Sequence, residues 1–103
     1  MMFSTEHRHV TQGVMAHVAS DLQVLLWQLI DLRKAEGGEL DYLQVFSLIY
    51  DCKLGRALQR ITHTQEVPPY SKSCLYTVSQ PVCRTVWVID SGEYATMLLP
   101  DEY

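Results

Sequence analysis

The sequence carries little charge and no long apolar run. Lys, Arg, Asp and Glu together make up 19% of its 103 residues, whereas soluble domains typically contain about 25%. No apolar run approaches the roughly 20 residues that cross a bilayer, and the N-terminus lacks the apolar core of a secretory signal. We therefore expect a cytoplasmic protein without a membrane segment. The scarcity of charge also indicates that part of the surface contacts another copy or another protein.

Basic residues are scarce as well. Eight Lys and Arg residues against twelve Asp and Glu residues give a net charge of −4. Binding to nucleic acid depends on clustered cations that displace counterions from the phosphates. Arg33 and Lys34 are the only adjacent basic pair, and near the end of a predicted helix they complement the helix dipole instead. The charge balance therefore argues against a nucleic-acid partner.

Recognised catalytic and cofactor motifs are missing. The chain has no G-x-G-x-x-G, Walker loop, H-E-x-x-H, G-x-S-x-G or zinc-ligand quartet. The three cysteines, Cys52, Cys74 and Cys83, form no C-x-x-C pair, so we interpret them as reduced, inert thiols. Cys52 also shares a predicted strand face with apolar residues, which places it in the core. The sequence predicts no cofactor, no metal and no catalytic residue, so an enzyme is the less favoured hypothesis.

One segment has a clear helical pattern. Ser20 and Gln23 fit a capping box at its start, and Gly37-Gly38 fits its end, which predicts a helix over residues 21–36. One apolar face repeats at helical spacing, and a sheet is expected to cover it.

The same helix has a second apolar flank. Val24, Trp27 and Ile30 widen the apolar set beyond one face, so the helix is expected to contact more than one surface. Either a loop or a partner subunit covers this flank. The partner alternative makes Val24, Trp27 and Ile30 candidate interface residues.

After the glycines the apolar period becomes alternating, which predicts strands. With a short N-terminal strand, the expected strands are residues 5–11, 46–54, 56–67, 74–78, 85–90 and 94–99. Short connections favour antiparallel neighbours. Residues 85–90 are apolar on both faces, as in a central strand that is covered on both sides. We expect a single α+β domain over residues 1–103, with one long amphipathic helix packed on a curved, meander- or roll-like antiparallel sheet.

Six stretches carry a family resemblance, two in the predicted helix and four after it: residues 26–27, 29–31, 40–46, 63–66, 87–90 and 96–100. Together they resemble a small Firmicute family known as domain of unknown function 960, from about residue 3 to residue 103. The resemblance implies a bacterial cytosolic protein and brings no known reaction, substrate, cofactor or catalytic residue. The family pattern does not feature His7, His9 or the cysteines, which weakens metal or thiol chemistry built on them.

His63 and Gln65 are the best candidates for a ligand site. They share one face near the end of a predicted strand, and histidine titrates near neutral pH. With Tyr70 and Trp87 they are expected to surround a concavity between helix and sheet, where a small molecule can bind. No Ser or Cys lies at a motif-defining distance, so binding is favoured over catalysis. The simpler interpretation is a hydrogen-bonded strand end.

His7 and His9 form an H-x-H pair whose side chains share one strand face, an arrangement that suits a shared metal. A third ligand would have to come from elsewhere, for example from His17 or His63. We therefore interpret the pair as an exposed polar strand face.

Two functions follow from these patterns. The preferred one is a non-enzymatic interaction module that self-associates as a homodimer, through the second helix flank or an uncovered sheet edge. The alternative is a small-molecule binding protein or enzyme with a pocket near His63 and Gln65.

Overall fold

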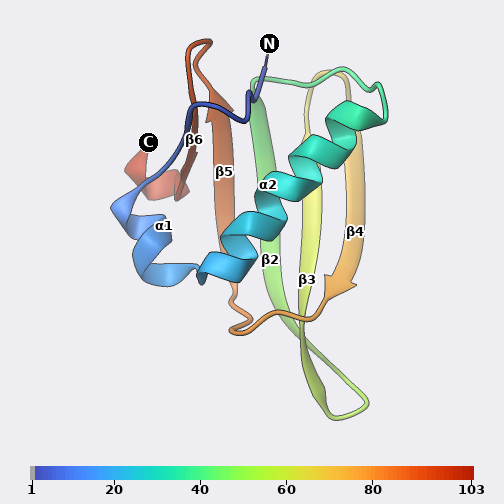
Figure 1. Cartoon of the computed structure of the whole chain (residues 1–103). Helices are drawn as coiled ribbons and strands as arrows, with labels where there is room; N and C mark the ends of the chain where they lie inside the picture. The colour runs from blue at the N-terminus through green and yellow to red at the C-terminus, as the bar shows by residue number, and fades with distance from the viewer. Residues whose placement is uncertain (1) are drawn as a thin grey trace.

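The computed structural model describes residues 2–103 as a six-stranded sheet with one long helix across one face (Figure 1). The sheet is open, and its strand order is β1-β6-β5-β2-β3-β4. Along the chain the elements are β1 (Arg8–Val10), α1 (Gln12–His17), α2 (Ser20–Ala35), β2 (Leu43–Lys53), β3 (Arg56–Gln65), β4 (Tyr70–Tyr76), β5 (Arg84–Asp90), β6 (Ala95–Leu98) and the 3-10 turn η1 (Pro100–Glu102). No helix in residues 2–103 is long and apolar enough to span a membrane.

The strand order departs from a simple meander. β2, β3 and β4 are successive antiparallel neighbours, and β5 and β6 form a second antiparallel pair. β5, however, pairs with the other side of β2, and β1 joins β6 in parallel. The buried side chain of Gln59 holds the returning connection, because it donates to the carbonyl of Val82 (3.0 Å) and accepts from the amide of Val82 (2.8 Å).

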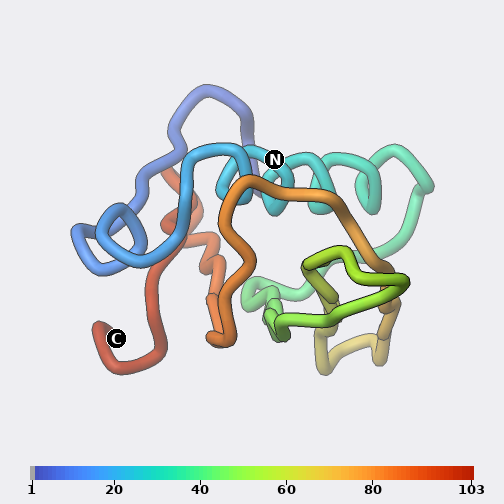
Figure 2. The backbone as a smooth tube through the Cα atoms, turned by 90° about the horizontal axis from the view of Figure 1, so that it is seen from below, coloured from blue at the N-terminus to red at the C-terminus, as the bar shows by residue number. Residues whose placement is uncertain are grey.

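Helix α2 lies against the sheet along a buried row of Leu22, Leu26 and Ile30. Figure 2, seen along the sheet, shows the helix and the strands as two layers. The inward side chains of the strands complete the core: Phe46, Leu48, Ile61, Val86, Val88, Ala95 and Met97. Burying such side chains contributes about 1.5–3 kcal/mol each, so this face fixes the position of α2.

The predicted capping box at the start of α2 is wrong. The helix begins one residue earlier, at Ser20, and its N-cap is Ala19, which has no side-chain hydrogen bond. Gln23 instead donates to the carbonyl of Val18 (2.8 Å). Asp21 accepts from the amide and hydroxyl of Ser79 (2.7 and 2.8 Å). The polar side chains of the first turn therefore hold neighbouring segments, and Asp21 also accepts from the amide of Leu22 in its own helix (3.0 Å).

The second flank of α2 is covered by the N-terminal segment of the same chain. The Arg8 guanidinium lies 4.7 Å from the centre of the Trp27 ring and donates to Asp31 (3.1 Å). Arg8 also donates to the carbonyls of Phe3 (2.9 Å) and Ser4 (3.1 Å), and Phe3 itself is fully buried. Of the two expected covers, the loop is the one that the structure contains.

The predicted interface residues consequently separate. Ile30 lies in the core with 0% exposure, which rules it out as an interface residue, and Trp27 lies beneath Arg8. Only Val24, at 54% exposure, faces solvent. The physical reason is the helical period, since six positions at about 100° each turn a side chain roughly 120° away from its starting direction.

Only one face of the sheet is covered by α2. Val86 and Val88 of β5 point toward the helix and are fully buried, whereas Trp87 and Ile89 alternate to the other face and stay partly exposed. The prediction that residues 85–90 are covered on both sides is therefore wrong. Strand β2 extends this apolar surface, and we call the set the open-face patch: Leu43, Val45, Trp87 and Ile89. Leu98 of β6 lies opposite Trp87 on the same face but is only 6% exposed.

The β2–β3 hairpin extends beyond the other strands (Figure 1). It turns at Leu54 and Gly55, whose φ angles are 52° and 76°, the conformation that matches the twist of a two-residue hairpin. Helix α2 does not reach this end (Figure 1), so the inward row of β2 runs into solvent and Cys52 is exposed. The prediction that Cys52 lies in the core is wrong. Cys83 is also exposed, and Cys74 is half-buried.

Candidate functional site

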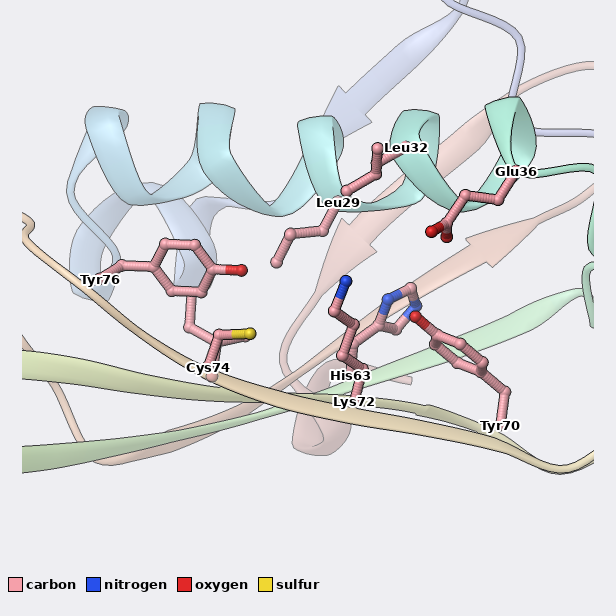
Figure 3. Close-up of a pocket in the computed structure, with 9 residues that line it drawn as sticks. Leu29, Leu32, Glu36, His63, Tyr70, Lys72, Cys74 and Tyr76 are labelled. Atoms are coloured by element: carbon pink, nitrogen blue, oxygen red, sulfur yellow. The ribbon is translucent and has the colours of Figure 1, made fainter.

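A groove runs between helix α2 and the part of the sheet formed by β3 and β4. Pleating turns alternate side chains of both strands toward the helix, with His63 of β3 opposite Lys72 of β4 in the register. Figure 3 shows these side chains facing Leu29, Leu32 and Glu36 of α2 across the groove. Helix and sheet thus contribute one wall each.

Hydrogen bonds to Gln44 fix the tautomer of His63. The two side chains meet at 2.6 Å, between His63 Nε2 and Gln44 Oε1. Gln44 Nε2 already donates to the Asp41 carbonyl (2.8 Å) and to Gln65 Oε1 (2.9 Å). Because both amide hydrogens of Gln44 are used, its oxygen accepts and His63 carries its proton on Nε2. Nδ1 of His63 is left as an acceptor.

Gln65 holds two loops rather than a ligand. Its Nε2 donates to the carbonyls of Glu39 (2.9 Å) and Pro68 (2.8 Å). Its Oε1 accepts from the Asp41 amide (3.1 Å) and from Gln44. Gln65 is 5% exposed, and these four bonds use every hydrogen-bonding position of its amide group.

His63 is neutral at pH 7. Burial, with a smaller contribution from the nearby Arg33 guanidinium, lowers the pKa of His63 from 6.5 to about 4. Its ring stacks on Phe46 at 4.4 Å and meets the edge of Tyr70 at 5.4 Å. In this state the imidazole accepts a hydrogen bond but carries no charge for electrostatic catalysis.

The groove has a polar end near Tyr70. The Arg33 guanidinium lies 4.1 Å from the centre of the Tyr70 ring. It also fills the space beside Gly38, where a Cβ would overlap it. Glu36 and Lys72 reach toward this end from opposite walls (Figure 3). Arg33 Nε is buried and is the one such side-chain atom in residues 2–103 without a hydrogen-bond partner.

The opposite end of the groove is less polar. Cys74 and Tyr76 line it together with Leu29. Burial and then a hydrogen bond with Cys74 raise the pKa of Tyr76, so the phenol stays protonated.

The enclosed space in the groove is small, about 10 Å³. That volume holds roughly one water molecule, whereas pockets for small organic ligands measure about 300–1,000 Å³. The enclosed space in the groove is therefore too small for a metabolite.

Trp87 lies outside this groove. It sits on the opposite face of the sheet, paired in register with Val45 and Leu98, and its ring meets Tyr103 at 5.8 Å. Of the four predicted ligand residues, His63 and Tyr70 line the groove. Gln65 does not line it but is hydrogen-bonded to Gln44, the partner of His63. The sequence did not reveal on which face of the sheet Trp87 lies, because the orientation of each strand's side chains depends on its register with the neighbouring strands.

His7 and His9 line a shallow hollow at the other edge of the sheet, together with Glu93 and Tyr94. His9 meets the Tyr94 ring edge-on at 5.3 Å. Nowhere in residues 2–103 do three or more His, Cys, Asp or Glu side chains gather as a metal site.

Sequence reasoning missed Gln44 and Arg33. Gln44 is 0% exposed, and it occupies an inward position two residues before Phe46 on β2. A glutamine in phase with a buried apolar row is a detectable signal, because a buried amide needs partners. Arg33 gave no such signal, since a basic residue in the last helical turn already fits the helix dipole.

Comparisons with known proteins identify a family and a similar fold. A family model described as a staphylococcal protein of unknown function, DUF960, matches residues 7–102. The chain belongs to the DUF960 family. Its fold is similar to the crystal structure of a protein of unknown function from Enterococcus faecalis, with a TM-score of 0.80 and 22% identity over 100% of this chain and 96% of that one. No curated protein matches the chain. The comparisons therefore identify the family and the fold of this DUF960 protein but assign it no reaction or ligand.

Proposed function

We propose that this DUF960 protein is a non-enzymatic cytosolic interaction module that self-associates through the uncovered face of its sheet. The observation that carries the proposal is the open-face patch. The apolar residues of β5 alternate between the two faces of the sheet, but α2 covers only one of these faces. A second copy packed on the open face would supply the missing layer.

The patch is continuous. Leu43 lies opposite Ile89, and Val45 lies opposite Trp87 in the β2–β5 register. Trp87 in turn lies opposite Leu98 of β6. Cross-strand side chains of this kind are about 5 Å apart, so the four side chains of the patch form one surface across two adjacent strands, with the buried Leu98 beside them.

The charge distribution favours a second copy as the occupant. The open-face patch contains no charged residue, so two chains of net charge −4 would not bring like charges together there. The nearest charged pair on this face of β2 and β3, Asp51 and Arg60, is joined by a salt bridge of 3.1 Å. Hydroxyl side chains line much of the remaining face, beside the apolar Ile49, Leu58 and Leu75: Ser47, Thr62, Thr64, Ser71, Ser73 and Thr85.

The area of the face is close to that of a standard interface. Six strands spaced about 4.8 Å apart and some seven residues long span roughly 24 Å by 24 Å. The accessible surface of such a corrugated face exceeds its flat area of about 600 Å² and approaches the roughly 800 Å² that each partner buries in a standard interface. Packing of two such faces yields a sandwich with an apolar centre.

Concentration-dependent sedimentation tests the proposal. We expect the untagged protein to sediment as a dimer at micromolar concentration and Val45→Lys to sediment as a monomer, because the ammonium group would be buried in the sheet–sheet contact. Trp87→Gln is a second variant in case Val45→Lys unfolds, and circular dichroism checks both folds. The matched control is Val24→Lys on α2, which should leave the dimer intact.

Two outcomes would count against the open face. A wild-type protein that stays monomeric to the millimolar range contradicts self-association. A dimer that Val24→Lys disrupts and Val45→Lys preserves would move the contact to the helix. Small-molecule binding near His63 and Gln65 is not proposed, because the enclosed space of about 10 Å³ holds roughly one water.

A further inference from the structure

β4 is an unprotected sheet edge. Its seven residues contain no proline, and no other element in residues 2–103 pairs with its outer side. The opposite edge strand, β1, is only three residues long. Folded proteins usually protect long edges with prolines, bulges or covering segments because free backbone groups recruit further strands. β4 lacks the first of these protections, and its single charged side chain is Lys72.

The register identifies which backbone groups of β4 face outward. In a two-residue hairpin the flanking residues, here Lys53 and Arg56, form a hydrogen-bonded pair, and such pairs alternate along the strands. Every second residue of β3 from Arg56 onward therefore bonds to β2, and the residues between them bond to β4. Because His63 lies opposite Lys72, the inward residues of β4 use their backbone groups on β3.

The residues with outward-facing backbone groups are therefore Ser71, Ser73 and Leu75. A contact of β2 agrees with the same phase: the Tyr50 amide points away from β3 and donates to Cys83 Sγ (3.3 Å). The edge thus presents three amides and three carbonyls in one row. This is the pattern that an added strand satisfies.

The groove under α2 runs along this same edge. Its helix wall consists of Leu29 and Leu32, with Glu36 at one end, and Leu32 is 48% exposed although it belongs to the apolar repeat of the helix. Its floor is formed by side chains of β4, of which Figure 3 labels Tyr70, Lys72, Cys74 and Tyr76. A side chain projecting from an added strand on the helix side would therefore lie against Leu32 at the mouth of the groove, outside the enclosed space of about 10 Å³.

We infer that this edge and groove bind an extended segment of another polypeptide, which adds to β4 as a seventh strand. Its backbone pairs with Ser71, Ser73 and Leu75. On the helix side it carries an aliphatic residue, which packs against Leu29 and Leu32. On the other side it carries small polar residues, which lie beside the hydroxyls of Ser71 and Ser73.

A second copy of this chain does not fit the groove in the same way. The twofold pairing of β4 with itself, centred on Ser73, places Lys72 of each copy opposite Cys74 of the other, beneath the aliphatic wall. Burial of an ammonium group against Leu29 and Leu32 has a large desolvation cost. The row that β4 presents to the helix contains no aliphatic side chain, so it would leave this wall without a partner.

A display library of random octapeptides, panned against the folded full-length protein, tests the inference. Enriched sequences should alternate aliphatic and small polar residues and should lack central prolines. The most enriched peptide, made synthetically, should slow hydrogen exchange at the amides of Ser71, Ser73 and Leu75. N-methylation of the peptide at the alternate amides that face β4 should abolish binding, whereas methylation one residue along should not.

Two matched helix variants localise the contact. Leu32→Lys should weaken peptide binding at least about tenfold, because it places a charge in the aliphatic wall. Val24→Lys makes the same change at a comparably exposed residue of α2 outside the groove and should leave binding unchanged. Both variants keep the buried row of the helix, so their folds can be compared by thermal unfolding.

Several results would overturn the inference: no enrichment over an unrelated protein, equal loss of binding in both methylated peptides, or full binding by Leu32→Lys. Self-association that Leu32→Lys removes would assign the edge to a second copy instead. The proposed self-association is tested separately, because Val45→Lys on the open face should not change peptide binding. Peptide binding without dimers, or dimers without peptide binding, would identify which of the two proposals fails.

Discussion

Acid should destabilise this protein through His63 in particular. The native imidazole is neutral because burial lowers its pKa from 6.5 to about 4, whereas in the unfolded chain it titrates normally near 6.5. Between these two values the unfolded state binds more protons than the native state, so the free energy of unfolding falls as the pH falls. The contribution of neutral His63 is complete above pH 6.5 and is lost between pH 6.5 and about 4.

The size of the effect follows from the displacement of the pKa. Each unit corresponds to about 1.4 kcal/mol, so the displacement from 6.5 to about 4 amounts to about 3 kcal/mol. For a domain of this size that is a substantial share of a total stability of roughly 5–15 kcal/mol. The bond from His63 Nε2 to Gln44 persists throughout this range, because it uses the proton that the neutral ring already carries.

Urea unfolding at a series of pH values from 7.5 to 4 measures the effect. Wild type is compared with His63→Gln, whose amide can still donate to Gln44 but does not titrate. The difference in unfolding free energy between the two should change by about 3 kcal/mol across the series. Carboxyl groups that also titrate here contribute equally to both proteins and cancel. His7→Gln, at an exposed histidine outside the groove, is the matched control for the exchange of histidine for glutamine.

Parallel curves for wild type and His63→Gln would refute the reasoning. They would mean that His63 titrates alike in the folded and unfolded chains and is therefore not a buried neutral residue. A difference of opposite sign would mean that the folded protein stabilises the imidazolium, and the groove would then hold a cation beside Arg33.

Two further predictions concern the cover of α2 and the polar end of the groove. Trp27→Ala should lower the free energy of unfolding by about 2 kcal/mol to the same extent at high and low protein concentration, because the ring packs beneath Arg8 of its own chain; denaturation at two concentrations checks this, and a loss confined to the dilute sample would place Trp27 in an interface. Gly38→Ala should displace the Arg33 guanidinium from Tyr70 and lower the free energy of unfolding by about 1 kcal/mol. In an Arg33→Met background the same substitution should leave the free energy of unfolding unchanged. Equal losses in both backgrounds would show that the backbone at Gly38, and not Arg33, is the cause.

The regular elements could be read from local patterns because the patterns are repeated many times. The helix expected at residues 21–36 is α2, Ser20–Ala35, and the strand expected at residues 56–67 is β3, Arg56–Gln65. In each case a run of apolar residues at one period outweighs any single residue. The predicted cap at Ser20 failed because Gln23 and Asp21 bond to other segments, which a local motif does not reveal.

The sequence predicted only part of the candidate site. His63 and Gln65 could be paired from the alternation of a single strand, and the structure joins them through Gln44. Trp87 was assigned to the same site on the assumption that its strand faced the same way. The register places it on the open face instead.

The order of residues alone determined which segments form α2 and the strands, since period and turn chemistry act between near neighbours. It did not identify α1, Gln12–His17. It also identified the flank of α2 that needs a cover. Only the tertiary structure decided that Arg8 and Phe3 provide this cover, that β5 pairs beside β2, and that Trp87 and the edge of β4 remain open. These outcomes depend on contacts between segments far apart in the chain, whose free energies are comparable for several arrangements until the whole core is packed.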